Sequence, residues 1–277
     1  MTTFYVSGDI EGMSGYKQNP EPGENDRILH AHYIAAAEGL REGGAGKILL
    51  KSMHGVPGEY PDYVTPIRKV IPSEFDLPGI DAAKADGLVL VGFHGIPPHC
   101  GWGHAYRFSN LVLNGKRIGE TTIEVYRAAV AGVPTVLFAG DSHAAEELRE
   151  ISPEAVVVVL RPGSLNLDEG PLDDKMLSAL RDGAKKAAGL AAAGKVPVPK
   201  MPAMFRLEVP LPAFRTEAPL AAEAAAITPR VLPYPVVVEG NRVSYESEDF
   251  LEVHRFFQDM FNFAGAFRRL DAARTGK

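Results

Sequence analysis

The fold is decided by the stretch Phe4-Tyr5-Val6-Ser7-Gly8-Asp9-Ile10-Glu11-Gly12, in which a short apolar segment runs directly into two acidic residues. Short apolar segments of this kind are typical of strands that are buried on both faces of a sheet. The glycines on either side of the acidic pair allow the backbone to pass close to a ligand. The stretch therefore predicts a buried strand that ends in a candidate binding site.

Downstream of this stretch, apolar segments alternate with segments of helical periodicity. Further strands are predicted over Lys47 to Met53, Ala85 to Phe93, Pro134 to Ala139 and Ala155 to Leu160. Helices are predicted over Asn25 to Gly43, Glu120 to Ala131, the segment from a cap at Asp141 or Ser142 to Glu150, and residues 172 to 193. This alternation predicts an α/β fold with a mostly parallel sheet that is covered by helices on both faces.

The remaining segments predict a hairpin and a second domain. Asn114-Gly115 lies between two short extended segments and is a strong signal for a type I′ turn. The proline-rich segment 196–202 has the composition of a linker. We therefore expect a catalytic, metal-binding α/β domain over residues 1–195 and a smaller C-terminal α+β domain over 196–277. The smaller domain is predicted to contain strands at 204–209 and 236–245 and helices at 218–226 and 247–263.

Composition narrows the class of protein. The 277 residues are 45% hydrophobic and 23% charged, which is ordinary for a globular protein, and the net charge is -6. A basic nucleic-acid surface is therefore not expected, and no apolar run reaches the length of a membrane span. The single cysteine, Cys100, excludes a disulfide within the chain and a cysteine-rich zinc site. We expect a cytoplasmic protein without a signal peptide, a nucleic-acid partner or a membrane partner.

Acidic residues and histidines follow three of the predicted strands. Asp9 and Glu11 follow the first, His54 the second and His94 the third. Ligands of open parallel sheets gather beyond the carboxyl ends of the strands, so these four side chains should share one edge. Carboxylates and imidazoles without a thiolate suit zinc, manganese or cobalt. The sequence therefore predicts a metal site.

Each residue taken alone also has a plainer explanation. A histidine at a strand end is commonly a satisfied polar residue, although both His54 and His94 are followed directly by glycine. Glu120 opens a helix, and its position alone favours an electrostatic role at the positive end of the helix. His104 lies in a glycine-rich loop, which leaves a general-base role and a surface role open. His143 follows a strand end and could support the site or belong to a capping segment.

The glycines after the first strand do not indicate a nucleotide site. Gly8, Gly12 and Gly15 are spaced G-x3-G-x2-G, which differs from the dinucleotide motif, and no P-loop lysine follows. Asp9 and Glu11 would repel a phosphate at the start of the next helix.

With these residues in view, the sequence resembles the DppA-type D-aminopeptidases, a family of zinc peptidases. Val6 to Gly15 resembles the family's Ser-x-Asp-x-Glu-Gly-x-Ser-Gly signature, and Gly92-Phe93-His94 resembles its second histidine motif. Gly103-His104 resembles the catalytic-histidine segment, and Ile118-Gly119-Glu120 resembles Val-Gly-Glu. The stretch from Val133 to Asp141 resembles a further motif. Order and approximate spacing hold over residues 1 to about 160.

The resemblance implies zinc ligands at Asp9, Glu11, His54, His94 and Glu120, with two Zn²⁺ per protomer and Mn²⁺ or Co²⁺ as alternatives. It thereby replaces the electrostatic interpretation of Glu120. It also implies a catalytic role for His104, a small peptide substrate and a homodecamer of two stacked five-fold rings. The chain departs from the family at Ser52, where an aspartate usually stands two residues before the first histidine. A partner that orients that histidine is therefore lost or replaced.

Three functions are weighed on this basis. The first is hydrolysis of short peptides with an N-terminal D-amino acid by a two-metal site, with D-Ala-D-Ala as the model substrate. The second keeps the site in a metal-dependent amidase or phosphoesterase that acts on a non-peptide small molecule. The third is a non-enzymatic peptide-binding protein with a structural metal, which would need a closed four-ligand site. Five ligands of mixed type favour the first two.

Overall fold

The computed structural model describes residues 2–52, 65–66, 85–96, 111–163, 171–210, 234–239 and 242–260. The chain divides into two compact units. The first unit comprises Met1–Trp102 and Gly119–Met201, and the second comprises Gly103–Ile118 and Pro202–Lys277. The sequence predicted a single boundary at residue 195. The structure instead groups Gly103–Ile118 with the C-terminal segment, because a strand of the hairpin pairs with a strand beyond the linker.

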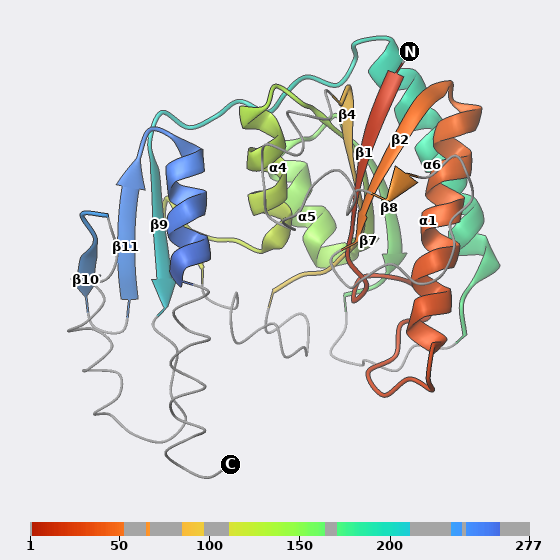
Figure 1. Ribbon diagram of the computed structural model, residues 1–277, viewed down its shortest axis with the longest axis horizontal. Coiled ribbons are helices and arrows are strands. Elements are labelled where there is room, and N and C mark those ends of the chain that lie inside the picture. Colours follow the sequence, from red (N-terminus) through yellow and green to blue (C-terminus); the bar gives the residue numbers. More distant parts are fainter. Residues whose placement is uncertain are drawn as a thin grey trace. The chain divides into compact units, whose positions relative to one another are not determined.

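The first unit is built on a parallel six-stranded sheet (Figure 1). Its strands are β1 (Thr2–Gly8), β2 (Ala45–Ser52), β3 (Thr65–Pro66), β4 (Gly87–Phe93), β7 (Thr135–Asp141) and β8 (Val156–Arg161). They lie in the order β3-β2-β1-β4-β7-β8, and every neighbouring pair is parallel. β4 and β7 are buried along their whole length, as their uninterrupted apolar sequences predicted. The predicted parallel α/β sheet is confirmed.

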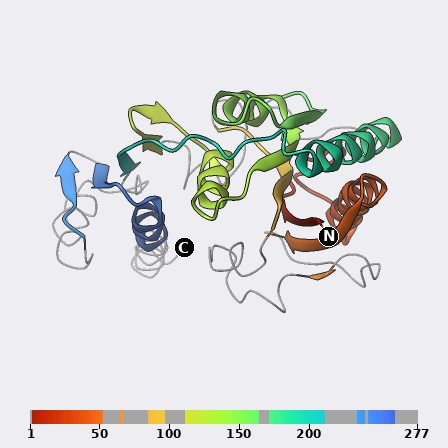
Figure 2. The ribbon, with the colours of Figure 1, turned by 90° about the horizontal axis from the view of Figure 1, so that it is seen from above.

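Among the described residues, four helices cover the two faces of this sheet (Figures 1 and 2). They are α1 (Glu24–Glu42), α4 (Glu120–Val130), α5 (Ser142–Ile151) and α6 (Asp174–Ala192). α1 and α6 pack against each other and against one face, where Phe4 and Val6 of β1 and Leu40 of α1 belong to one buried apolar cluster. α4 and α5 cover the other face, where Tyr5 of β1 packs in a cluster with Val125 of α4. Successive side chains of a strand point to opposite faces, so β1 contributes to both cores.

The strand order reverses direction between β1 and β4. From β1 the chain proceeds through α1 to β2 and β3 on one side, whereas from β4 it proceeds through α4 to β7 and β8 on the other. Connections that leave in opposite directions open a crevice beyond the carboxyl ends of the two central strands. Asp9 and His94 are the first residues after β1 and β4, so both lie at this edge of the sheet.

The second unit contains an antiparallel sheet of order β10-β11-β9-β5-β6. Its strands are β5 (Val112–Leu113), β6 (Lys116–Arg117), β9 (Phe205–Pro210), β10 (Val237–Glu239) and β11 (Arg242–Ser247), and residues 250–260 are helical. Asn114 and Gly115 have φ of 51° and 81°, which confirms the type I′ hairpin. The single strand predicted at 236–245 is instead two antiparallel strands. The helix predicted at 218–226 lies outside the described residues.

Across the described ranges, no helix combines the length and the apolar character that crossing a membrane requires.

Candidate metal centre

Asp9 and Glu11 lie in a tight turn that is fastened to the neighbouring strand β4. The Asp9 N–H donates a 2.8 Å hydrogen bond to the Val91 carbonyl, and the Gly12 N–H donates a 2.7 Å bond to the Gly92 carbonyl. A Cβ atom at Gly12 would lie 1.9 Å from the carbonyl oxygen of Phe93, so only glycine permits this approach. The glycine that follows Glu11 therefore brings both carboxylates to the end of β4.

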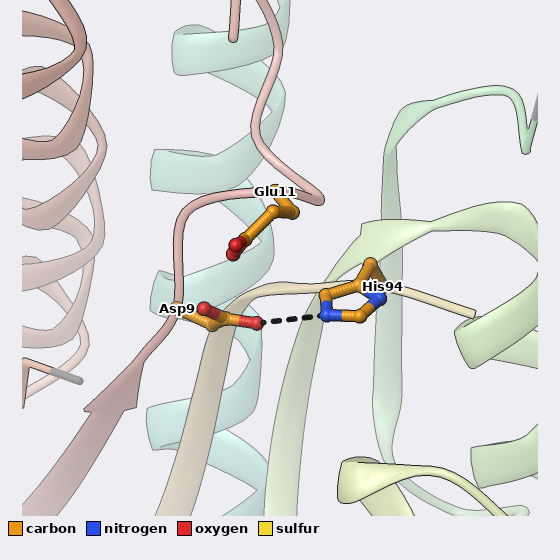
Figure 3. Close-up of side chains that lie close together, drawn as sticks. All are labelled: Asp9, Glu11 and His94. Atoms are coloured by element: carbon orange, nitrogen blue, oxygen red, sulfur yellow. Dashed lines mark ion pairs between the residues drawn. The ribbon is translucent and has the colours of Figure 1, made fainter. Parts of the chain in front are cut away.

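His94 is the first residue after β4, and its ring orientation is fixed. Its Nδ1 lies 2.8 Å from the carbonyl oxygen of Gly95. A carbonyl only accepts hydrogen bonds, so Nδ1 carries the ring proton and Nε2 keeps the lone pair that a metal ion needs. Nε2 points toward the turn and lies 3.6 Å from Oδ2 of Asp9 (Figure 3).

The three side chains form a compact group of donor atoms. One ligand atom from each of Asp9, Glu11 and His94 lies within 4.8 Å of the other two. Their exposed fractions are 2%, 4% and 8%. Two carboxylates that are buried together favour a nearby cation, because burial and mutual repulsion both disfavour their charged forms. Oxygen and imidazole donors at this spacing fit a divalent metal ion. Within the described parts of the chain this is the one such group.

Two residues that the sequence analysis did not single out border the group. Arg161 ends β8 and donates a 2.7 Å hydrogen bond from Nη1 to the backbone carbonyl of Glu11. Burial raises the pKa of the Tyr16 phenol, and the charges of Glu11 and Asp9 raise it further, while Arg161 acts in the opposite direction. Tyr16 therefore keeps its proton beside the two carboxylates. The position of Arg161 directly after a predicted strand could have identified it as a site residue, because the acids and histidines were found from their positions after strands.

Asp141 links His94 to the start of α5. Its Oδ2 accepts a 2.7 Å hydrogen bond from the Gly95 N–H, and its Oδ1 accepts a 2.8 Å bond from the Ala144 N–H. Asp141 is thus the N-cap of α5, which settles the choice between Asp141 and Ser142. His143 lies next to Gly95, where an added Cβ would approach the His143 Cβ to 2.7 Å.

Glu120 is the first residue of α4 and belongs to the first unit, but it is not among the three residues whose ligand atoms lie within 4.8 Å of one another. The start of α4 is held by Glu147 of α5, which sequence reasoning also missed. Its Oε1 accepts hydrogen bonds from the N–H groups of Gly119 and Thr122 at 2.9 and 3.0 Å and from the Thr122 hydroxyl. His54 and His104 lie outside the described residues.

Comparisons with known proteins identify the family and a similar fold. A family model described as D-aminopeptidase matches residues 3–259. The structure is similar to that of the Zn-dependent D-aminopeptidase DppA from Bacillus subtilis, which is described as a self-compartmentalizing protease. The TM-score is 0.68 at 16% sequence identity, and the match covers 95% of this chain and 98% of that one. A search of curated proteins gives no match.

The structural likeness supports the fold, and the family model spans nearly the whole sequence and both units. The chain belongs to the D-aminopeptidase family and is a metallo-aminopeptidase, a hydrolase of peptide bonds.

Proposed function

We propose that the protein is a zinc-dependent aminopeptidase that removes N-terminal D-amino acids from short peptides, with D-Ala-D-Ala as the model substrate. Two Zn²⁺ ions per protomer would be held by Asp9, Glu11, His54, His94 and Glu120. The observation that carries the proposal is the buried Asp9–Glu11–His94 group at the point where the strand order reverses. Membership of the D-aminopeptidase family supports the reaction.

A contact between the end of β1 and α4 supports Glu120 as a ligand. It lies two residues before Asp9 along the chain on the β1 side and four residues after Glu120 on α4. Ser7 Oγ lies 3.5 Å from Oε2 of Glu124, and both residues are buried. Ser7 is the last but one residue of β1, and Asp9 is the first residue after the strand. Glu124 follows Glu120 by four residues, so these two share one face of α4.

The direction of α4 completes this argument. Val130 ends α4 and Thr135 begins β7, so the helix runs opposite to the parallel strands and starts at their carboxyl edge. One helical turn from Glu124 to Glu120 covers about 6 Å, and two strand residues from Ser7 to Asp9 cover about 6.6 Å, toward the same edge. Glu120 is therefore expected at the level of Asp9.

The end of β2 supports His54 in the same way. Ser52 is the last residue of β2 and is in register with Gly8, the residue before Asp9. The chain thus leaves β2 level with the metal-binding turn, and His54 follows two residues later.

The residues divide the chemical work between them. Bound divalent ions supply Lewis-acid polarisation of the scissile carbonyl and lower the pKa of a water molecule toward neutrality. Asp9, Glu11 and His94 would bind the metals, and Arg161 holds the turn that carries the two acids. The family resemblance assigns the catalytic role to His104, which would transfer protons or stabilise the developing oxyanion.

The oligomer and the location of the protein are part of the proposal. We expect a homodecamer of two stacked five-fold rings in the cytoplasm. The DppA structure is described as self-compartmentalizing, which supports an assembly that encloses its active sites.

The test compares hydrolysis of D-Ala-D-Ala and L-Ala-L-Ala by zinc-loaded protein. The proposal predicts cleavage of the D,D dipeptide in preference to the L,L dipeptide. Glu11→Gln should abolish this activity, whereas Glu154→Gln, which changes an exposed acid in the same way, should not. Zinc binding without cleavage of either dipeptide would contradict the proposed D-Ala-D-Ala-like substrate and lead to a panel of amides and phosphoesters, the second candidate function.

A further inference from the structure

We propose that Asp141 is a positioning residue for His94, which it holds in the tautomer and orientation required for metal binding. The proposal rests on the proposed function, because it treats His94 as a metal ligand. Asp141 itself does not belong to the three-residue donor group.

The link between the two side chains runs through one glycine. Oδ2 of Asp141 accepts the 2.7 Å hydrogen bond from the Gly95 N–H, and the Gly95 carbonyl accepts the 2.8 Å bond from His94 Nδ1. Asp141 therefore holds the backbone of Gly95, and the carbonyl of Gly95 in turn orients the imidazole ring of His94. Asp141 and His94 are only 3% and 8% exposed, so water has little access to replace either bond.

The carboxylate is itself anchored from a second direction. Its other oxygen accepts the 2.8 Å bond from Ala144 N–H at the start of α5, where the helix dipole favours a negative charge. The planar carboxylate of Asp141 thus sets the spacing between the first turn of α5 and the backbone beside His94. Gly95 is also confined by His143, whose Cβ would lie 2.7 Å from an added Cβ.

The alternative is that Asp141 only caps α5 and has no effect on His94. A second aspartate N-cap in the chain serves as a control for that role. Asp173 caps α6 and accepts a 2.8 Å hydrogen bond from the Lys175 N–H. Serine can replace aspartate as an N-cap at both positions. At position 141, however, the shorter serine side chain has one oxygen and cannot hold both N–H groups at the observed geometry. Asp141→Ser and Asp173→Ser therefore make the same change in capping chemistry, and only Asp141→Ser releases Gly95.

The experiment measures zinc affinity of the full-length variants by competition with a chromophoric chelator. Loss of a group that orients a metal-bound histidine weakens metal binding by about 10- to 100-fold. We expect a decrease of this size in Asp141→Ser and wild-type affinity in Asp173→Ser. Wild-type affinity in both variants would show that Asp141 is only a helix cap and would overturn the proposal.

A second measurement does not depend on metal. Long-range ¹H–¹⁵N spectra of the zinc-free protein report which ring nitrogen of His94 carries the proton, with His94→Gln used for assignment. The wild type should show the Nδ1–H tautomer, and Asp141→Ser should show a mixture of tautomers. An unchanged tautomer would overturn the link to His94. A wild type that binds no zinc would refute the proposed function instead, and the spectra would still test the link.

Asp141→Asn serves if the serine variant does not fold. Its carboxamide keeps the shape of the side chain and one acceptor oxygen, while its NH₂ group faces one of the two backbone N–H groups. We expect a smaller loss of zinc affinity in the same direction. Unchanged affinity and tautomer in this variant would also overturn the proposal.

Discussion

Arg161 donates a 2.7 Å hydrogen bond from Nη1 to the backbone carbonyl of Glu11, which joins the end of β8 to the turn after β1 across 150 positions of sequence. Both residues are buried, with exposed fractions of 4%. The bond is charge-assisted, and it fixes the backbone of Glu11, a proposed metal ligand, through its carbonyl group.

Replacing Arg161 should therefore weaken the metal site. A hydrogen bond to a charged group contributes about 1.5–3 kcal/mol, so we expect Arg161→Met to reduce zinc affinity by roughly 10- to 100-fold. Arg161→Lys retains a donor and should lose less. Chelator competition measures the affinities, and Arg149→Met, at an exposed arginine of α5, is the control. Equal zinc affinity in Arg161→Met and the wild type would contradict the role of this bond.

The start of α4 should depend on Glu147. Glu147→Ala removes the acceptor for the N–H groups of Gly119 and Thr122, which should lower the free energy of unfolding by about 1–2 kcal/mol. If Glu120 binds metal, zinc affinity should fall as well, because α4 begins at that residue. Glu146→Ala is a matched control, since the side chain of Glu146 is 70% exposed. Urea unfolding and zinc titration measure both effects. A loss of stability without any loss of zinc affinity would argue against Glu120 as a ligand.

Alanine at Gly12 should displace the metal-binding turn. The added Cβ would meet the Phe93 carbonyl oxygen at 1.9 Å, and overpacking of this kind costs about 1–3 kcal/mol. We expect lower stability and lower zinc occupancy. At Gly189 on α6 no atom lies within 4 Å of an added Cβ, so Gly189→Ala should instead stabilise the helix by about 0.5–1 kcal/mol. Thermal unfolding and metal analysis distinguish the two variants. A Gly12→Ala protein with full zinc occupancy would show that the turn does not need its close approach to β4.

His32 should make the metal-free protein less stable in acid. Burial lowers the pKa of its ring to about 4, an effect that outweighs the opposing bond from Nδ1 to the Ile28 carbonyl. The unfolded chain takes up a proton near pH 6.5, whereas the folded chain does not until about pH 4. The free energy of unfolding should therefore fall as the pH falls through this window, by about 2 kcal/mol at pH 5.

Urea unfolding at pH 7 and pH 5, with a chelator present, measures this effect. His32→Leu should remove the part of the fall in the free energy of unfolding, between pH 7 and pH 5, that is due to His32. His30→Gln, which keeps His32 on the same helix, should retain it. A His32→Leu protein with the wild-type pH dependence would show that another group is responsible.

The parallel sheet and the grouping of Asp9, Glu11 and His94 could be predicted because both depend on local patterns. The apolar stretch before Asp9 and the one before His94 each formed a buried strand, and the two strands are neighbours in the sheet. Glu147 could not be found in this way, because its partners lie 25 and 28 residues away and its position resembles that of any helix-surface acid.

Pairing between distant segments also explains where the predicted organisation differs. The hairpin strand β5 pairs with β9 through Val112 and Glu208, and no local signal specifies that partner. The segment 236–245 was predicted as one strand although Gly240-Asn241 is a turn signal in its middle, and Val237–Glu239 instead pairs antiparallel with Arg242–Ser244. Short-range patterns specify an element, but long-range pairing decides to which unit it belongs.

The most direct test of the central claim is the location and number of zinc ions in zinc-reconstituted crystals, measured by anomalous diffraction and by metal content per protomer. We predict close to two Zn²⁺ per protomer, with anomalous density among Asp9, Glu11 and His94. Reconstituted protein without zinc at these three residues would contradict the proposed metal centre.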